Sequence, residues 1–343
     1  MSITLSLNQL ENSGLIQQAQ IEPELEYMFR HALVQDASYE SLLKADRRAL
    51  HATVAQTLEQ LYSARLDEIS ATMADHYERA ENYPKALDYY LRAGSAAAKL
   101  YANAEAALLY SRAIELISIP EANATTKIVN DLFSQYGRVL ELSGKYKDAI
   151  ENYRQMQAEA IRRHEKQMEM DALIAQAIIQ ATPSPVHNNS QAQLLCEQAL
   201  TIAHTLQNRE AESRIYWILL LVNHFGQNNP KSIEYGKKSL EIARAINHRE
   251  RMAFTLNDIA RSYFSIGDFG NAVQAIEEAR ALWEELGNLP MLTDNLTSYA
   301  EYKLLLGDVQ DALDLARQAY EIGKKINNIW GQSFALSLQA QAY

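Results

Sequence analysis

The sequence predicts an all-α fold in which antiparallel helical hairpins stack into a solenoid, and three observations support this prediction. First, small residues recur in pairs seven positions apart, as in Ala272 and Ala279. This spacing is nearly two helical turns, so both side chains share one face and let a neighbouring helix pack closely. Second, several pairs follow a glycine and a few polar residues, the pattern of a helix end and tight turn. Third, the later pairs return about every forty residues, as expected for stacked repeats.

Seven pairs, two of them weaker, follow this pattern: Ala86/Ala93, Ala106/Ala113, Ala149/Met156, Ala192/Ala199, Ser232/Ser239, Ala272/Ala279 and Ala312/Ala319. Pro84, Pro230 and Pro290 fall where the pattern starts a helix, a position that tolerates proline. The sequence therefore predicts helices over residues 69–80, 84–100, 102–118, 125–143, 146–164, 167–181, 190–206, 210–225, 230–246, 249–266, 270–286, 290–306 and 309–326, and from Trp330 onward.

The composition agrees with a helical protein and disfavours several classes of partner. Gly (12) and Pro (7) are few among 343 residues, which favours helix. The net charge of −11 argues against broad binding to nucleic acid or anionic lipid. The single cysteine, Cys196, fits a reducing compartment and lies on the packing face three residues before Ala199. Because the sequence shows no long apolar run or leader pattern, we expect a soluble, cytoplasmic chain without a membrane partner.

The first 62 residues do not follow the repeat. Ile3 to Asn12 has the spacing of a helix, and two short extended runs, 15–20 and 25–29, flank a turn at Glu22-Pro23. The second run alternates apolar and polar residues, which predicts a half-buried strand. Two further helices are expected over 31–44 and 46–62. This order resembles the back half of a winged helix, so we expect residues 1–62 to be a partial winged-helix-like segment and residues 66–343 to be the repeat array.

One part of the chain resembles a known family. The run Tyr27-Met-Phe-Arg-His-Ala-Leu-Val-Gln-Asp-Ala-Ser-Tyr-Glu-Ser-Leu-Leu43, with Arg47-Arg48-Ala-Leu-His51 after it, is similar to the junction between ATPase module and repeats in bacterial STAND-type signalling ATPases. That family includes adenylate-cyclase-associated ATPases and large LuxR-type regulators. The resemblance covers roughly residues 10–118 and includes the start of a tetratricopeptide array at Met73-Ala-Asp-His-Tyr-Glu-Arg-Ala80. It implies a sensor arm in a signal-transduction protein, with the ATPase module of the same parent protein as a candidate partner.

The sequence itself carries no sign of catalysis. The phosphate-binding loop of such ATPases, G-x-x-x-x-G-K-[ST], has no match. The eight histidines and the one cysteine show no metal-ligand spacing, and His31 and His51 of the junction are expected to be hydrogen-bonded structural residues. We therefore expect no enzyme activity, cofactor or metal. The alternative is a fragment of a nucleotide-hydrolysing or adenylate-cyclase enzyme whose catalytic domains lie outside this chain. A spacer without any external ligand is a third possibility.

The repeats resemble the tetratricopeptide pattern of large and small packing residues, best around Leu256 and Ala260. Stepping one period beyond Ala300 places Tyr343 inside the first helix of another repeat. In such solenoids the first helix of each repeat lines the concave groove, where a protein or peptide ligand binds. Taking the glycine of each turn as the reference predicts these groove residues: Arg138, Tyr216, Phe254, Asn257, Arg261, Phe264 and Glu301. The alternative for the two phenylalanines is that neighbouring repeats cover their rings.

Overall fold

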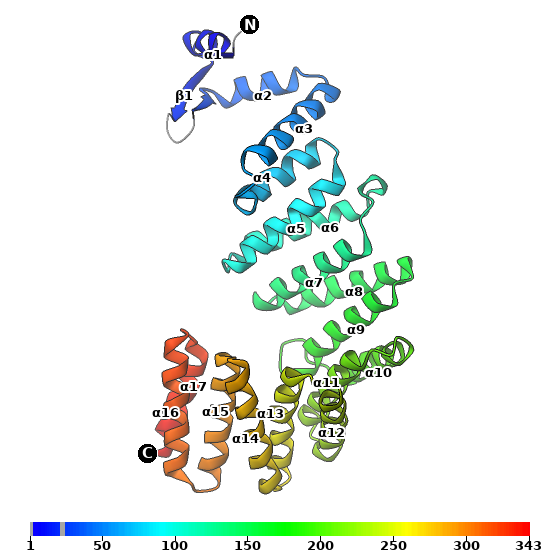
Figure 1. Cartoon of the computed structure of the whole chain (residues 1–343), viewed down its shortest axis with the longest axis vertical. Helices are drawn as coiled ribbons and strands as arrows, with labels where there is room; N and C mark the ends of the chain where they lie inside the picture. The colour runs from blue at the N-terminus through cyan, green and yellow to red at the C-terminus, as the bar shows by residue number, and fades with distance from the viewer. Residues whose placement is uncertain (1–2, 21–24) are drawn as a thin grey trace. The chain divides into compact units, whose positions relative to one another are not determined.

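The computed structural model describes residues 3–20 and 25–343, and α-helices dominate it (Figure 1). The elements are, in chain order, α1 (Ile3–Asn12), β1 (Ile16–Gln20), β2 (Glu26–Phe29), α2 (Ala32–Glu40), α3 (Lys44–Leu61), α4 (Leu66–Arg79), α5 (Tyr83–Lys99), α6 (Asn103–Ile117), a 3-10 turn (Pro120–Ala122), α7 (Thr126–Leu142), α8 (Tyr146–Arg163), α9 (Lys166–Ala181), α10 (Asn189–Thr205), α11 (Arg209–Phe225), α12 (Asn229–Ala245), α13 (Arg249–Ser265), α14 (Phe269–Leu286), α15 (Leu289–Leu305), α16 (Val309–Lys325) and α17 (Ile329–Ala342). From α5 onward every boundary lies within one residue of its predicted position.

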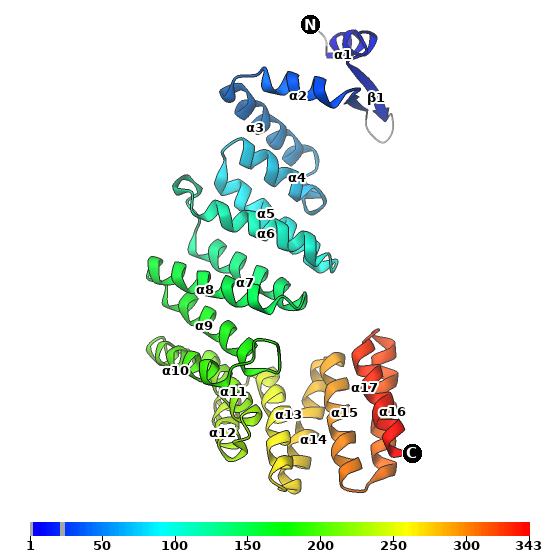
Figure 2. The same ribbon diagram turned by 180° about the vertical axis from the view of Figure 1, so that it is seen from behind.

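The chain divides into two compact units, residues 1–135 and 136–343, with the boundary inside α7. In the second unit the hairpins α11–α12, α13–α14 and α15–α16 follow one another along the array in both views (Figures 1 and 2). Helix α11 also contacts α9 and α13, α15 contacts α17, and Asn257 of α13 hydrogen-bonds to Asp294 and Asn295 of α15, so the first helices of successive repeats adjoin. The predicted all-α solenoid of tetratricopeptide-like hairpins is thereby confirmed.

The small-residue pairs pack as the sequence predicted. Ala272 and Ala279 of α14 have no exposed surface, and neither do Ser232 and Ser239 of α12. The lone thiol of Cys196 is equally buried. Because a larger residue at these places would force close-packed helices apart, the pairs set how near each second helix lies to its neighbours.

From the end of α10 onward, the turns repeat with a period of twenty residues. Each contains one residue with a left-handed backbone: Gln207, Gln227, Asn247, Gly267, Gly287, Gly307 and Asn327. At Gly267 the amide nitrogen donates to the Phe264 carbonyl and that of Asp268 to the Tyr263 carbonyl, both at 3.0 Å, which closes the helix end as a Schellman motif. Except at Asp308, the side chain of the next residue caps the following helix, as when Asn288 accepts from the Met291 amide at 3.2 Å. Two helix–turn units of twenty residues produce the forty-residue repeat.

The N-terminal segment differs from prediction in burial. Strands β1 and β2 pair antiparallel after α1, with Ile16 opposite Phe29. The second strand was predicted to be half-buried, but Leu25 and Phe29 are 57% and 39% exposed, because only α1 and α2 contact the hairpin appreciably among the described residues. The turn expected at Glu22-Pro23 lies outside the described residues. Helix α2 ends at Glu40, earlier than predicted, because Leu43 is extended and starts α3.

Candidate partner-binding face

The first helices of the second unit hold a cluster of aromatic and charged side chains. We call it the α11–α15 cluster and define it by these residues: Trp217, Arg251, Phe254, Asp258, Arg261 and Asp294. Trp217 belongs to α11, the next four residues to α13 and Asp294 to α15. They fall on one side of the array because the hairpins repeat every forty residues, which brings equivalent positions of the first helices next to each other.

Trp217 connects α11 to α13. Its indole nitrogen donates to Oδ2 of Asp258 at 2.7 Å, and its ring lies 5.6 Å from that of Phe254. Phe254 in turn meets the edge of the buried Trp283 at 4.9 Å. The Asp258 carboxylate and neighbouring rings therefore fix the positions of the Trp217 and Phe254 side chains. Both side chains still keep part of their surface in solvent.

Arg251 is the least satisfied residue of the cluster. Its guanidinium lies over Trp217 at 4.7 Å and over Phe254 at 5.7 Å. Nε and Nη1 are buried and have no hydrogen-bond partner among the described residues. Burial, with the nearby charge of Arg214, lowers the pKa of Arg251 to about 10. A buried cation with unpaired donors costs free energy in the folded protein, so this residue calls for a functional explanation.

Arg261 bridges α13 and α15 through long polar contacts. Its Nη2 lies 3.3 Å from Oδ2 of Asp294 and 3.4 Å from Oγ of Ser298. On its own helix, Asp258 is 3.9 Å away. Burial raises the pKa of Asp258, whereas the charge of Arg261 and the Trp217 hydrogen bond act in the opposite direction. The centre of the cluster is thus a partly dehydrated group of charges, where electrostatic interactions are stronger than at an open surface.

The structure brings some of the predicted groove residues together and separates others. Phe254 and Arg261 belong to the cluster, and Glu301 is exposed on α15 nearby, where its charge acts on Arg261. Phe264 stacks on Tyr302 of α15 with ring centres 4.4 Å apart. The rings of both phenylalanines are therefore partly covered by neighbouring repeats.

Three predicted residues are not placed for a shared groove contact. The side chain of Asn257 points from α13 to α15, where its amide donates to Asp294 at 3.2 Å, and only 1% of its surface is exposed. Tyr216 turns toward the second helix α12, where its ring stacks on Tyr235 at 6.1 Å. Arg138 is exposed on α7 and pairs with Glu141 at 3.2 Å.

The position of Tyr216 has a simple cause. The glycine of the first turn after α11 is Gly226, but the left-handed residue of that turn is Gln227. Gln227, not Gly226, is therefore equivalent to Gly267, and the register of α11 moves by one residue. With this correction Trp217 becomes equivalent to Asn257, and Tyr216 becomes equivalent to the core residue Leu256.

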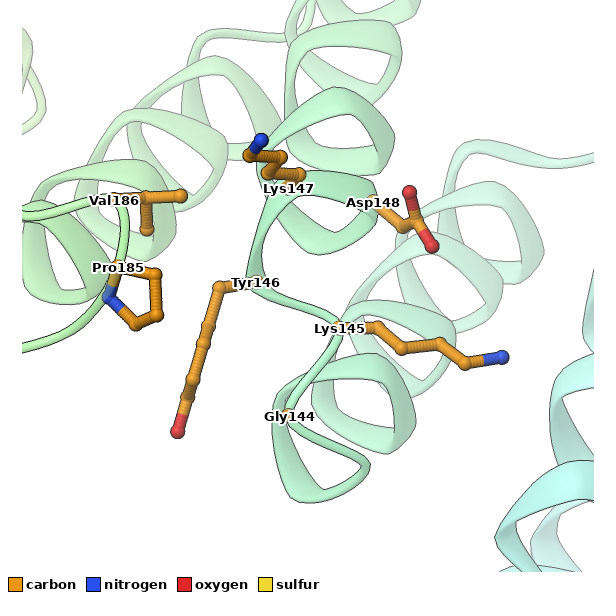
Figure 3. Close-up of a pocket in the computed structure, with 7 residues that line it drawn as sticks. All are labelled: Gly144, Lys145, Tyr146, Lys147, Asp148, Pro185 and Val186. Carbon is orange, nitrogen blue, oxygen red and sulfur yellow. The ribbon is translucent and has the colours of Figure 1, made fainter.

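A surface hollow lies elsewhere in the second unit. It lies where the turn before α8 meets the loop after α9, and residues 144–148, Pro185 and Val186 line it. Figure 3 shows the Tyr146 ring beside Pro185, with Val186 on the same side, while Lys145 and Asp148 point away. The hollow lies between two connections and has both apolar and charged residues in its lining.

In the first unit, the polar groups between helices mostly satisfy one another. Glu78 pairs with Arg112 and also accepts from the Tyr90 hydroxyl at 2.6 Å. His51 hydrogen-bonds to His76 through their Nδ1 atoms at 2.8 Å, as expected for a structural histidine. Within the described ranges 3–20 and 25–343, no group of three metal-binding side chains gathers, and no helix is long and apolar enough to cross a membrane.

Comparison with known proteins supports the repeat fold. Residues 251–325 match the family model of the tetratricopeptide repeat. No curated protein matches the sequence. The apo form of RapI aligns with 82% of this chain and 99% of its own, at 13% identity and a TM-score of 0.57. The Rap conjugation gene regulator of plasmid pLS20, solved with a Phr peptide, aligns with 79% of this chain and 75% of its own, at 13% identity and a TM-score of 0.55.

A STAND protein with a tetratricopeptide repeat sensor, from Pyrococcus horikoshii, covers 100% of this chain, which spans 49% of that protein. The identity is 16% and the TM-score is 0.45. The two Rap structures show the fold alone, and the likeness to the STAND protein carries no argument, so the STAND resemblance of residues 10–118 stays a prediction.

Proposed function

We propose that the first-helix face of the second unit binds a segment of a partner protein, and that the chain is a non-catalytic interaction module. The α11–α15 cluster carries this proposal, because it combines two aromatic side chains and two arginines from adjoining helices on a partly exposed surface. Trp and Arg are enriched among the residues that dominate binding energy at protein interfaces. A neighbour with the same fold was solved with a peptide bound, which supports a peptide as the ligand class.

Arg251 gives the proposal its sharpest support. Two of its donors are buried without an acceptor among the described residues. A bound segment that parts the two covering rings and offers a carbonyl would satisfy those donors. The free protein would then carry a cost that binding removes, which is a common arrangement at functional sites.

A more specific proposal concerns the class of signalling protein to which this interaction module belongs. We propose that the chain is the sensor arm of a signal-transduction ATPase, with the ATPase module as one partner. The support is the STAND resemblance of residues 10–118 together with the order of helix α1, the β1–β2 hairpin and α2, which fits a partial winged helix. The enzyme-fragment alternative predicts catalytic domains outside this chain and leaves the role of the α11–α15 cluster unchanged.

The test is a selection of peptides from a random twelve-residue display library against the full chain, followed by fluorescence anisotropy with the selected peptides. Arg251→Met replaces a buried cation by an apolar side chain of similar volume, so the free protein should be as stable or more stable. The same variant should lose roughly tenfold in affinity or more. Trp217→Ala with Phe254→Ala should abolish binding, provided circular dichroism shows a folded array.

A matched control removes two aromatic rings remote from the cluster, through Tyr101→Ala and Tyr146→Ala. Tyr101 is 87% exposed in the turn before α6 and Tyr146 lines the surface hollow, so both lie outside the α11–α15 cluster. This control should bind the selected peptides as the parent does. A folded Arg251→Met variant that binds them with parental affinity would show that the cluster is not the site.

A further inference from the structure

The region between α13 and α15 contains more carboxylates than cations. Asp258, Asp294 and Glu301 face Arg261, whose contacts with the first two are 3.9 and 3.3 Å long. Glu301 is exposed, and its charge reaches Arg261 without a close contact. All three carboxylates act electrostatically on Arg261, whereas Arg251 lies against the Trp217 and Phe254 rings, close to Arg214 of α11.

Tyr302 adds an independent sign that the region lacks a hydrogen-bonding group. It is 4% exposed, and its hydroxyl has no hydrogen-bond partner in the part of the chain that the structure describes. The hydroxyl is close enough to Arg261, Asp258 and Glu301 for their charges to act on its ionisation. An unpaired buried hydroxyl costs free energy, and it is the second observation pointing to a missing polar group at this place.

The hydrogen bonds that are present show which kind of group is missing. Asp258 accepts the Trp217 indole at 2.7 Å, and Asp294 accepts the Asn257 amide at 3.2 Å. Each ionised carboxylate has room for about four hydrogen bonds. The side chains between α13 and α15 therefore offer spare acceptors and negative charge, which suit a ligand group that brings several donors and a positive charge.

We propose that the segment bound by this face inserts a basic side chain, Arg or Lys, between Asp258, Asp294 and Glu301. This inference rests on the proposed peptide-binding function and names the chemistry of its ligand. Arg251 already lies over the Trp217 and Phe254 rings, so the ligand's basic side chain would enter from the α15 side, where Asp294 and Glu301 lie. A guanidinium fits two carboxylates on adjoining helices better than a point-like ammonium does, so arginine should be preferred to lysine.

The experiment compares the sequences and affinities of peptides selected from the random twelve-residue library. Peptides enriched on the parent chain should contain Arg, or less often Lys, at one shared position. Replacing that residue by Gln, or introducing Asp294→Asn with Glu301→Gln into the protein, should weaken binding roughly tenfold or more. Glu301→Gln alone leaves the buried groups untouched and should cost a smaller, salt-dependent factor.

The matched control changes two exposed carboxylates on second helices, through Glu241→Gln on α12 and Glu321→Gln on α16. It alters the net charge equally and should leave the affinity within about twofold, because distant exposed charges are screened by salt. This control separates a specific pairing from a general attraction between a basic peptide and an acidic protein.

The experiment distinguishes a failure of the basic-residue inference from a failure of the proposed peptide-binding function. Enriched peptides without a shared basic residue, or undiminished affinity for folded Asp294→Asn/Glu301→Gln protein, would overturn the inference. If those peptides still required Trp217 and Phe254, the binding function would survive. A library that yields no enriched peptide on the parent chain would overturn both.

Discussion

Gly137 of α7 allows α8 to pack at its observed distance, and replacing it by alanine should destabilise the array. A Cβ atom at this position would lie 2.2 Å from Cζ of Tyr153, whereas ordinary contacts begin at 3.4 Å. The ring would have to move by about 1 Å. It has little room to do so, because Tyr153 is 4% exposed and its hydroxyl donates to Glu141 at 2.7 Å.

Three contributions set the size of the effect. Forced overpacking costs about 1–3 kcal/mol. Weakening the hydrogen bond to a charged carboxylate costs up to about 2 kcal/mol. Alanine returns about 1 kcal/mol through its higher helix propensity. The net expectation for Gly137→Ala is therefore a loss of about 2 kcal/mol, or roughly 4–8 °C in Tm for a unit of this size.

The assay is thermal unfolding followed by far-ultraviolet circular dichroism, with Gly270→Ala as the matched control. Gly270 lies in the first turn of α14, and an added Cβ there meets nothing within 4 Å. That substitution should leave the Tm unchanged or raise it. In a Tyr153→Ala background, which removes the obstructing ring, Gly137→Ala should also become neutral or stabilising. A Gly137→Ala protein as stable as its parent would refute the packing argument.

The remaining predictions concern stability and reactivity. Hydrogen bonds from Lys85 and Tyr77 lower the pKa of Glu59 to about 2, so its stabilisation is complete above about pH 5 and is lost as the pH falls toward 2. Glu59→Gln should accordingly reduce stability by about 1 kcal/mol at pH 7, after allowance for solvent screening, and by progressively less below pH 5 in urea titrations. Burial raises the pKa of the Cys196 thiol, so a thiol reagent such as dithionitrobenzoate should react with it only as the second unit unfolds. Ala279→Arg, which places a charge at a fully buried helix contact, should lower the urea midpoint by an amount equivalent to several kcal/mol, and an unchanged midpoint would contradict the contact.

The sequence was sufficient for the fold because the fold is specified locally. Most helix ends from α10 onward are marked by a left-handed turn residue and a capping side chain, and close helix contacts by small residues such as Ala272. Periodicity alone therefore predicted the helices from α5 onward within one residue. It failed at α2, where no glycine or proline marks the helix end at Glu40 and the chain turns through Ser41 instead.

The candidate site was harder to predict because it depends on pairs far apart in the sequence. Trp217 and Asp258 are 41 residues apart, and Asn257 and Asp294 are 37 apart. A one-residue error in register is enough to exchange Trp217 for Tyr216, and the visible glycine of that turn produced this error. The left-handed Gln227 carries no strong signal, since residues other than glycine adopt that conformation only occasionally. Equal spacing of the turns, rather than glycine itself, would have identified the correct residue.

From Gln207 to Asn327 the turns recur at fixed intervals of twenty residues, which sets how the array can change in length. Each left-handed residue and its following cap close one helix and open the next, using contacts that hardly extend beyond the turn itself. If the forty residues between two equivalent turns, such as those at 247 and 287, were deleted, the flanking helices would join with their packing faces in the original orientation. Removing thirty-nine or forty-one residues would rotate all later helices by about 100°. Insertions or deletions of forty codons in this region should therefore be tolerated. Such changes would alter the length of the array and its binding surface while every helix keeps its packing contacts.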